Sequence, residues 1–503
     1  MGARSRLAEL LGEAPADAEA VEFAESWWTW GMLRAAARSA GDLLGRLGLG
    51  AGARVGVVLE NRPEHAAVVI GLLATGRCVV TLSPLQPAGR LAADIARCEV
   101  PVVIASPAVL ALSGVPEAIT ARGAVIELAG DGAPRVTAGA VPPGPPGSPG
   151  VAIEMLTSGT TGPPKRVPLR DKQFDQALLS GGGPLKRGVL LRGGVTIAAT
   201  PMVHIGGMWA VVASLYAGRR VVLMPRFQVG PWVSAVERHR PKAAALVPAA
   251  LRGVLDAAVP ADKLSSLLVV TSGTTYCPPD LADAFFGTYG IPVLMTYGAT
   301  EFAGALAAWT LPMHREWWAA KRGSAGRPVP GVELRVVDEA GRPAGPRHSG
   351  HLEVRSAQSP RGATAWVRTS DLARIDEDGF LFIVGRADDT IIRGGFKVRP
   401  QQVREALERH PAVAEAAVVA LPDDRLGQVP AAAVELRPGT PAPDVAELIA
   451  ACRQVLTPYE VPVRVAILEE LPRTPSHKVS RADLAKLLTD GTDRTDGTDG
   501  RAG

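Results

Sequence analysis

A run of glycine and hydroxyl side chains in the first half of the chain has the composition of a phosphate-binding loop. It reads Thr157-Ser158-Gly159-Thr160-Thr161-Gly162-Pro163-Pro164-Lys165 and follows an apolar segment, residues 151–156, that we expect to be a strand. Glycine lets backbone N–H groups approach anionic oxygens, hydroxyl groups add donors, and Lys165 adds positive charge. A Walker P-loop is excluded, because it needs Gly before the Lys and Ser or Thr after it, whereas Pro164 and Arg166 stand here. Composition alone leaves a polyphosphate loop and a flexible surface loop as alternatives.

A second segment combines an aromatic ring, a glycine and a carboxylate. It reads Tyr297-Gly298-Ala299-Thr300-Glu301 and follows the apolar residues 291–295, which we expect to form a strand. An aromatic ring can stack on a base, glycine permits a tight turn, and a carboxylate can hold Mg²⁺. The structural alternative is a turn at the end of a strand with a hydrogen-bonded glutamate.

The elements around these segments alternate between strand and helix. Residues 54–59 are predicted to form a buried strand and residues 63–76 a helix, with Asn61 available near the helix start; residues 78–82 are predicted to form the next strand. Strand, helix and strand in this order predict a parallel βαβ unit. Because similar alternation recurs in residues 195–224 and 243–297, the predicted fold class is α/β.

The pattern changes after about residue 332. Short strands are predicted at 333–337, 351–354 and 380–384, which indicates a β-rich subdomain. A helix and two strands then indicate a compact α+β unit; they are predicted at 400–409, 414–420 and 431–436. The last fifteen residues repeat Thr-Asp-Gly and cannot build a core. We therefore predict an N-terminal domain at 1–386, a small C-terminal domain at 387–488 and a disordered tail at 489–503.

Bulk composition limits the possible classes of protein. The chain has 503 residues, 47% of them hydrophobic and 21% charged, which excludes wholesale disorder and favours more than one domain. The net charge of +4 without a dense basic block does not indicate a nucleic-acid partner. The four cysteines are scattered, so neither a zinc site nor a disulfide framework is expected. Because no signal peptide or run of about 18 apolar residues is found, we predict no membrane span and a cytoplasmic location.

The glycine-rich run resembles the phosphate-binding signature of the adenylate-forming superfamily, which comprises acyl-CoA synthetases, non-ribosomal adenylation domains and luciferases. The segment Tyr297-Gly298-Ala299-Thr300-Glu301 is similar to the family's YGxTE motif. The resemblance implies that Tyr297 stacks on adenine with Gly298 beside it, that Thr300 contacts phosphate, and that Glu301 holds Mg²⁺.

Further motifs occur in the family's order between about residues 25 and 488. A turn at Gly273-Thr274-Thr275 stands where the family has a small Gly-Gly-Ala-like turn beside adenine and the acyl group. The resemblance implies that Asp371 binds the ribose hydroxyls, that Arg386 contacts ribose or phosphate, and that Asp388 is the hinge between the domains. Thr274, Ser370 and His477 depart from the family's pattern.

Three other matches concern the acid and the acceptor. PxxHxxG at residues 201–207 implies that His204 contacts the carboxylate, and a segment similar to PRTxxGK implies that Lys478 is the catalytic lysine. Residues similar to the pantetheine-facing loop of acyl-CoA synthetases are Gly394, Gly395, Phe396 and Lys397.

The resemblance implies a large N-terminal domain of two βα-layered subdomains plus a small β-barrel-like subdomain, followed by a small mobile α+β domain. It also implies an enzyme that uses ATP and Mg²⁺ to convert a carboxylic acid into an acyl-adenylate and then transfers the acyl group to the thiol of CoA. A free-standing enzyme that loads a carrier protein, an enzyme that uses another nucleophile, and a non-catalytic nucleotide-binding homologue are the alternatives. The expected acid pocket is mostly small or apolar, consistent with a fatty or aryl acid; its expected residues are His204, Met208, 247–251 and 299–304.

Overall fold

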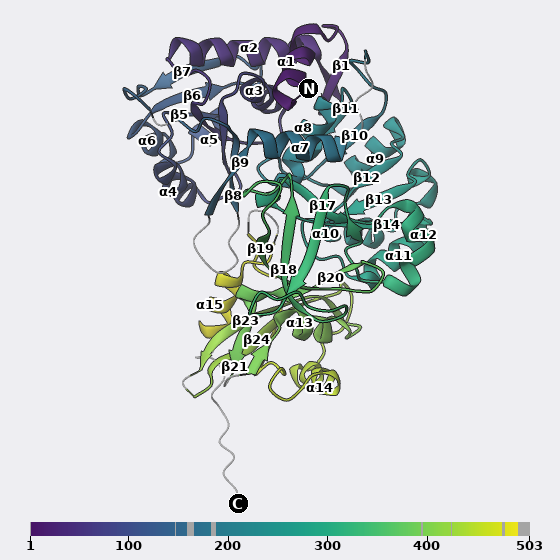
Figure 1. Ribbon diagram of the computed structural model, residues 1–503. Helices are drawn as coiled ribbons and strands as arrows, with labels where there is room; N and C mark the ends of the chain where they lie inside the picture. Colours follow the sequence, from purple (N-terminus) through teal and green to yellow (C-terminus); the bar gives the residue numbers. More distant parts are fainter. Residues whose placement is uncertain are drawn as a thin grey trace, which may run out of the picture.

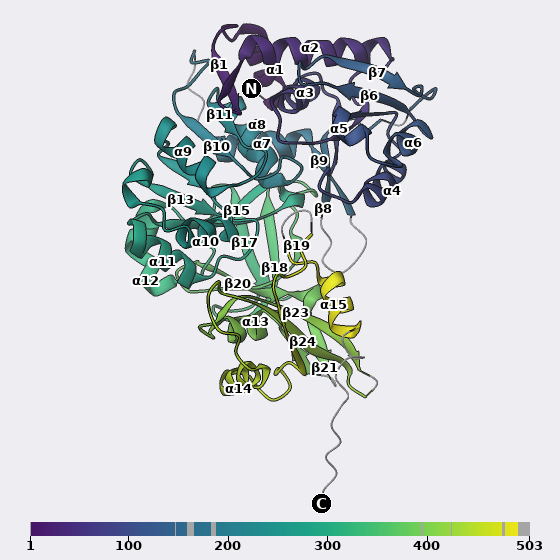
Figure 2. The ribbon, with the colours of Figure 1, turned by 180° about the vertical axis from the view of Figure 1, so that it is seen from behind.

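The computed structural model describes residues 2–145, 147–157, 165–182, 188–393, 396–423, 425–474 and 478–490. For Thr157, Lys165, Asp388 and Lys397 it describes the backbone only. Figures 1 and 2 show two parts: the larger contains the first twenty strands, and a smaller C-terminal part lies below it and ends with α15 (Arg481–Asp490).

A seven-stranded sheet forms the first layer of the larger part. Its central strands are parallel, and antiparallel strands β7 and β9 lie at its two edges. In spatial order the strands are β7 (Pro134–Ala138), β6 (Ala124–Leu128), β5 (Val102–Ala105), β3 (Arg54–Val58), β4 (Cys78–Leu82), β8 (Val151–Thr157) and β9 (Lys165–Arg170).

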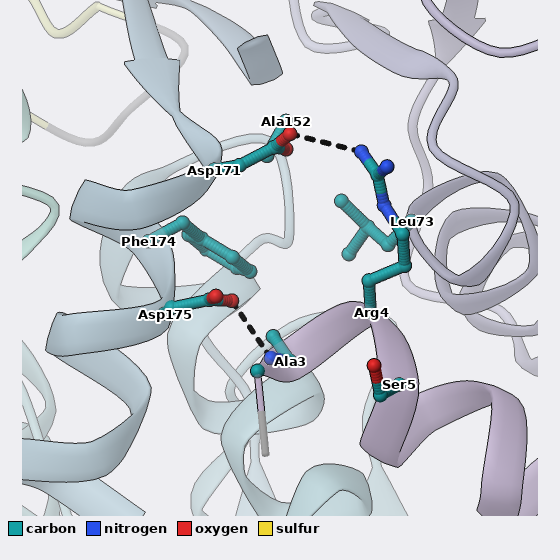
Figure 3. A pocket seen from close by; sticks show the side chains of 9 residues that line it. Ala3, Arg4, Ser5, Leu73, Ala152, Asp171, Phe174 and Asp175 are labelled. Atoms are coloured by element: carbon teal, nitrogen blue, oxygen red, sulfur yellow. Dashed lines mark hydrogen bonds and ion pairs between the residues drawn. The ribbon is translucent and has the colours of Figure 1, made fainter. Parts of the chain in front are cut away.

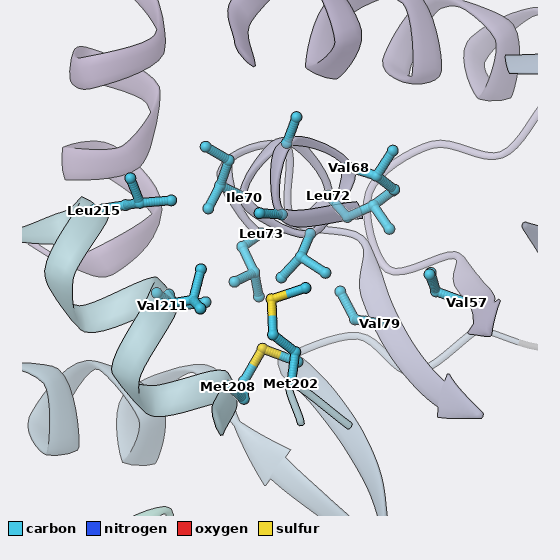
Figure 4. Packing of buried hydrophobic residues seen from close by; sticks show 14 of the residues in the cluster. Val57, Val68, Ile70, Leu72, Leu73, Val79, Met202, Met208, Val211 and Leu215 are labelled. Atoms are coloured by element: carbon cyan, nitrogen blue, oxygen red, sulfur yellow. The ribbon is translucent and has the colours of Figure 1, made fainter. Parts of the chain in front are cut away.

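Both faces of this sheet are covered, which explains its nearly continuous apolar strands. Along β4, Val79 belongs to one buried cluster, whereas Val80 and Leu82 belong to the cluster on the opposite face. Five helices pack on the first face: α1 (Ala3–Glu13), α2 (Trp30–Arg46), α3 (Pro63–Ala74), α7 (Asp171–Gly182) and α8 (Ile205–Tyr216). Figure 4 shows Met202, Met208 and Val211 packed toward α3 in this cluster. Three helices cover the other face: α4 (Ala88–Cys98), α5 (Pro107–Leu110) and α6 (Val115–Thr120).

Two further sheets continue the alternation of strand and helix. The first has the order β10 (Val195–Ala198), β11 (Arg220–Leu223), β1 (Glu19–Phe23) and β2 (Ser26–Thr29). The second has the order β12 (Ala243–Ala245), β13 (Val269–Ser272), β14 (Val293–Ala299), β15 (Gly304–Ala308) and β16 (Arg327–Pro328). The accompanying helices are α9 (Val229–His239), α10 (Pro248–Asp256), η1 (Ala261–Leu264), α11 (Pro279–Tyr289), η2 (Thr300–Phe302) and α12 (Leu311–Lys321).

The β-rich segment after residue 332 forms an antiparallel sheet of four strands. They are β17 (Val332–Val337), β18 (Gly350–Ser356), β19 (Val367–Ile375) and β20 (Leu381–Arg386). A short helix, η3 (Ala387–Asp389), follows directly after β20.

Residues 391–490, which we call the C-terminal unit, have cores of their own. Two buried clusters, one around Val418 and Val434 and the other around Leu471 and Leu484, contain no residue from outside this unit. Its strands are β21 (Ile391–Arg393), β22 (Phe396–Val398), β23 (Val413–Asp423), β24 (Gly427–Leu436) and β25 (Arg464–Leu468). Its helices are α13 (Pro400–Glu408), α14 (Val445–Val455) and α15.

The structure confirms the βαβ unit and corrects several details. Asn61 does not cap α3: residue 62 is the N-cap, and Pro63 begins the helix. Strand β14 continues through Tyr297 to Ala299 instead of ending before them. Helix α15 reaches Asp490, two residues into the predicted tail. No helix in the described part of the chain is both long and apolar enough to cross a membrane.

Candidate active site

Tyr297 and Asp371 are brought together from two different sheets. Tyr297, on β14, donates a hydrogen bond from its hydroxyl to Oδ2 of Asp371, on β19, over 2.5 Å. Burial raises the pKa of Tyr297 well above its usual range, and the Asp371 carboxylate raises it further. The tyrosine is therefore a neutral donor that orients this carboxylate. Asp371 lies inside strand β19.

Two more charged residues complete a cluster around Asp371. Arg386 is its partner across the β19–β20 ladder. Burial raises the pKa of Glu301, repulsion from Asp371 adds to this, and Arg386 opposes it. Gln173 of α7 donates a hydrogen bond to the backbone carbonyl of Glu301 and so fixes the short helix η2. Four of the predicted site residues thus lie within electrostatic reach of one another.

Lys478 reaches this cluster from the C-terminal unit. The residue keeps solvent access, but the surrounding protein lowers the pKa of its ammonium group; Arg386 lowers it further, and Asp371 opposes. These interactions show that Lys478 lies near Arg386 and Asp371, which stand about a hundred positions earlier in the chain. The present orientation of the C-terminal unit therefore directs Lys478 toward the Tyr297–Asp371 pair.

The segment that carries Lys478 is anchored on the strands beneath it. The backbone carbonyl of Lys478 accepts a hydrogen bond from the N–H of Thr474 over 2.6 Å. Arg473 contacts Glu415 of β23 at 2.7 Å and Glu435 of β24 at 3.2 Å. Sequence reasoning missed this anchor, because the two glutamates are distant in sequence. His477 lies outside the described residues.

His204 occupies the N-cap of α8, at the end of a segment that a buried asparagine holds in place. Asn61 donates to the carbonyls of Thr200 (3.1 Å) and Met224 (2.9 Å). Its side-chain oxygen accepts from the N–H of Met202 over 2.7 Å. Because these bonds fix the turn that leads into His204, Asn61 is a supporting residue of the candidate acid site that the sequence interpretation had treated as a helix cap.

The turn Gly273-Thr274-Thr275 lies at the end of β13 and next to the start of α8. Gly273 is required for close packing, because a Cβ there would lie 2.3 Å from the hydroxyl oxygen of Thr296. Thr274 has a φ of +68°, which is unusual for a β-branched residue. Its methyl group lies 3.0 Å from where a Cβ at Gly206 would stand. Thr274 therefore narrows the space beside the first turn of α8.

The ends of the glycine-rich run form a hairpin. Strands β8 and β9 are paired up to Thr157 and Lys165, whereas Ser158, Gly159, Thr160, Thr161 and Gly162 lie outside the described residues. Two ion pairs hold this hairpin: Glu154 of β8 pairs with Arg54 of β3 at 2.7 Å, and Arg166 of β9 pairs with Asp94 of α4 at 3.0 Å. Burial alone would raise the pKa of Glu154, but hydrogen bonds from Arg54 and Ser148 outweigh it and lower that pKa. These anchors were not found from the sequence.

The predicted hinge and pantetheine-facing residues are described in part. Asp388 lies in η3, and its neighbour Asp389 forms an ion pair with Arg481 at the start of α15. Phe396 is 57% exposed and stacks on Tyr459, with 4.7 Å between ring centroids. Gly394 and Gly395 lie outside the described residues, and only the backbone of Lys397 is described.

A separate pocket of about 220 Å³ shares no residue with this cluster. It is lined by the start of α1, by Leu73 and Ala152, and by α7 (Figure 3). Both of its carboxylates already have partners: Asp171 pairs with Arg4 at 2.9 Å, and Asp175 accepts from the N–H of Ala3 at 2.7 Å. These contacts attach α1 to α7, and we assign the pocket to packing.

Comparisons with known proteins agree with the fold and with the motifs of the candidate active site. A family model described as AMP-binding enzyme matches residues 9–362, and one described as AMP-binding enzyme C-terminal domain matches residues 402–478. The chain is 32% identical to a sulfoacetate–CoA ligase from Cupriavidus necator over 91% of this chain and 92% of that protein. It is 32% identical to a 2-succinylbenzoate–CoA ligase from Bacillus mycoides over 67% of this chain and 70% of that protein.

Solved structures show the same fold. ATP-bound MatB from Rhodopseudomonas palustris superposes with a TM-score of 0.83 at 23% identity, covering 97% of this chain and 99% of that one. An amide bond synthetase from Marinactinospora thermotolerans superposes with a TM-score of 0.80 at 27% identity, covering 97% and 100%. These findings confirm the α/β fold class and the resemblance predicted from the motifs.

Proposed function

The chain belongs to the AMP-binding enzyme family, and we propose that it activates a carboxylic acid with ATP as an acyl-adenylate and transfers the acyl group to the thiol of CoA. The observation that carries the proposal is the position of Lys478, whose charge lies near Asp371 and Arg386 although it belongs to the C-terminal unit. A non-catalytic nucleotide-binding homologue would not require a lysine of the C-terminal unit next to this cluster.

The first step joins two anions, so its barrier is largely electrostatic. A carboxylate oxygen of the acid attacks the α-phosphorus of ATP, and pyrophosphate leaves with the electrons of the broken P–O bond. We propose that Lys478 lies between the carboxylate and the α-phosphate and stabilises the charge that develops there. His204 would contact the acid, and Asp371, held by Tyr297, would accept hydrogen bonds from the ribose hydroxyls.

The β- and γ-phosphates would bind at the glycine-rich run 157–165, with Thr300 contributing its hydroxyl and Arg386 its charge. Gly273, Thr274, Thr275 and Gly298 would border the adenine. Glu301 would hold Mg²⁺, which supplies charge neutralisation when bound. No group of three or more His, Cys, Asp or Glu suited to a metal occurs among the described residues, so phosphate and water oxygens would complete its coordination.

In the second step, the sulfur of CoA attacks the acyl carbon and AMP leaves. We propose that the C-terminal unit rotates about Asp388, withdrawing Lys478 and bringing residues 394–397 toward the adenylate. The domain boundary at 386/387 and a cytoplasmic location are parts of the same proposal.

CoA is favoured as the acceptor because the two relatives named above are CoA ligases. An amine acceptor is the second candidate, favoured by the amide bond synthetase at 27% identity. Loading of a carrier protein is a third. The acids named for the relatives differ from each other. The residues expected to line the acid pocket are mostly small or apolar, and we propose a fatty or aryl acid.

The proposed function is tested by ATP–pyrophosphate exchange with a panel of acids that includes 2-succinylbenzoate, sulfoacetate, benzoates and fatty acids of increasing length. We expect acid-dependent exchange with at least one class. Adding CoA, a holo-carrier protein or an amine to the active acid then identifies the acceptor by mass spectrometry. Absence of exchange across the panel would favour the non-catalytic homologue.

A further inference from the structure

One side-chain contact crosses from the large part of the molecule to the C-terminal unit, away from the reacting groups. The guanidinium carbon of Arg404, on α13, lies 5.0 Å from the ring centroid of Tyr276, which follows the turn after β13. A guanidinium within about 6 Å of an aromatic ring is attracted to its face, more strongly when both groups are shielded from water. Tyr276 is half-buried at this contact; burial raises the pKa of its hydroxyl, and nearby Glu405 adds to that shift.

Arg404 is fixed by its own helix, so the contact reports the position of the whole unit. It donates a hydrogen bond to Gln401 over 2.5 Å and lies 3.7 Å from the carboxylate of Glu408. On the buried face of the same helix, Val403 and Leu407 belong to the core of the C-terminal unit. Helix α13 therefore cannot move away from Tyr276 without the rest of the unit.

A group of three charged residues lies across the same interface. Arg252, on α10 of the large part, is attracted by Glu408 and repelled by Arg437, both in the C-terminal unit. The attraction of Arg252 to Glu408 and its repulsion from Arg437 oppose each other. Arg252 therefore contributes less than the Tyr276–Arg404 contact to the preference for one orientation of the C-terminal unit.

We propose that Tyr276 and Arg404 are positioning residues that stabilise the orientation of the C-terminal unit in which Lys478 reaches Asp371 and Arg386. The inference rests on the proposed function for its catalytic meaning. Because the unit carries both Arg404 and Lys478, a rotation about η3 that withdraws the lysine also separates Arg404 from the ring. A contact made in only one of two states shifts the equilibrium toward that state.

The orientation can be measured without any substrate. All four native cysteines are buried, so nitroxide labels can be placed at Leu268→Cys in the large part and Val455→Cys in the C-terminal unit, which are 57% and 50% exposed. Double electron–electron resonance on the full chain should give one dominant distance. Tyr276→Ala should broaden or shift that distribution, whereas Tyr276→Phe, which keeps the ring, should preserve it.

A kinetic measurement then tests the consequence for catalysis, using the acid found active in the panel. Tyr276→Ala should lower pyrophosphate exchange about 3- to 10-fold, while thioester formation from the purified acyl-adenylate stays equal or rises. Arg404→Ala should likewise lower pyrophosphate exchange and spare thioester formation. The double variant should lose no more pyrophosphate exchange than either single variant.

Unchanged label distances in Tyr276→Ala would overturn the proposal, as would equal loss of both half-reactions in a variant that retains the wild-type melting temperature. A wild-type chain that shows no exchange refutes the proposed function instead, and the label distances still decide whether this contact sets the orientation.

Discussion

At the scale of single residues, Thr274 has a strained backbone within the turn Gly273-Thr274-Thr275. A left-handed backbone conformation costs a non-glycine residue roughly 1–2 kcal/mol, and at Thr274 the methyl group lies against the start of α8. The strained turn lies beside the first turn of α8, whose N-cap is His204. We infer that this side chain limits the width of the acids accepted.

Thr274→Gly should therefore widen the site at little cost in stability. Relief of strain and the greater freedom of glycine in the unfolded chain oppose each other, so the free energy of unfolding should stay within about 1 kcal/mol of wild type. The ratio of kcat/KM for a branched or bulkier acid to that for the unbranched acid should rise about tenfold. Thr288→Ala, at an exposed position of α11 outside the turn, is the control. A ratio that does not change would exclude Thr274 from the acid site.

At the scale of elements, the site depends on how turns are fixed to neighbouring strands. The turn before α8 has a buried support in Asn61, which is 6% exposed and bonds three backbone groups. The hairpin of β8 and β9 is held by ion pairs to β3 and α4. Neither support belongs to a recognisable motif, because each joins residues that only the sheet topology makes neighbours.

Asn61→Ala should destabilise the protein and disturb the binding of the acid more than that of ATP. Buried backbone groups lose their partners, which costs about 2–4 kcal/mol in total. Urea unfolding should show a lower midpoint, and KM for the acid should rise more than KM for ATP because the segment leading to His204 loosens. Asn61→Asp keeps the acceptor for Met202 but places a buried carboxylate against two carbonyl oxygens, so it should lose at least as much stability. An Asn61→Asp variant as stable as the wild type would contradict this account.

At the scale of the whole molecule, chemistry requires the C-terminal unit to deliver Lys478. Lys478→Ala should lower adenylate formation by about 10²–10³-fold, comparable to losing one preorganised electrostatic group, while the variant still converts the preformed adenylate to thioester. Lys486→Ala, an exposed lysine of α15, is the control. Equal loss of both half-reactions would contradict a role confined to the first step.

The same lysine predicts a pH dependence. Its pKa is lowered from 10.5, so its charge is lost at a lower pH than that of an ordinary lysine. Adenylate formation should be fully supported below the folded pKa and should decline as the pH rises through it. The alkaline limb should therefore begin earlier than the value of 10.5 implies, and it should be absent from the residual activity of Lys478→Ala.

Much of this protein was determined by its sequence alone. The βαβ unit at residues 54–82 follows from apolar runs and from Pro63, and the motifs of the site follow from side-chain types at fixed spacing. These features are local, so a single chain read in order contains them. Ends of elements were less predictable: β14 runs on through Tyr297 because pairing with β15 extends it.

Only the tertiary structure decided which of these residues meet. The bond between Tyr297 and Asp371, the approach of Lys478 to Arg386, and the stacking of Arg404 on Tyr276 each join different sheets or different units. Such contacts depend on the relative placement of elements separated by about 70 to 130 residues, which no local pattern encodes. Their strength depends in turn on burial, which sets the pKa of Tyr297 and Glu301 and arises only when the sheets pack.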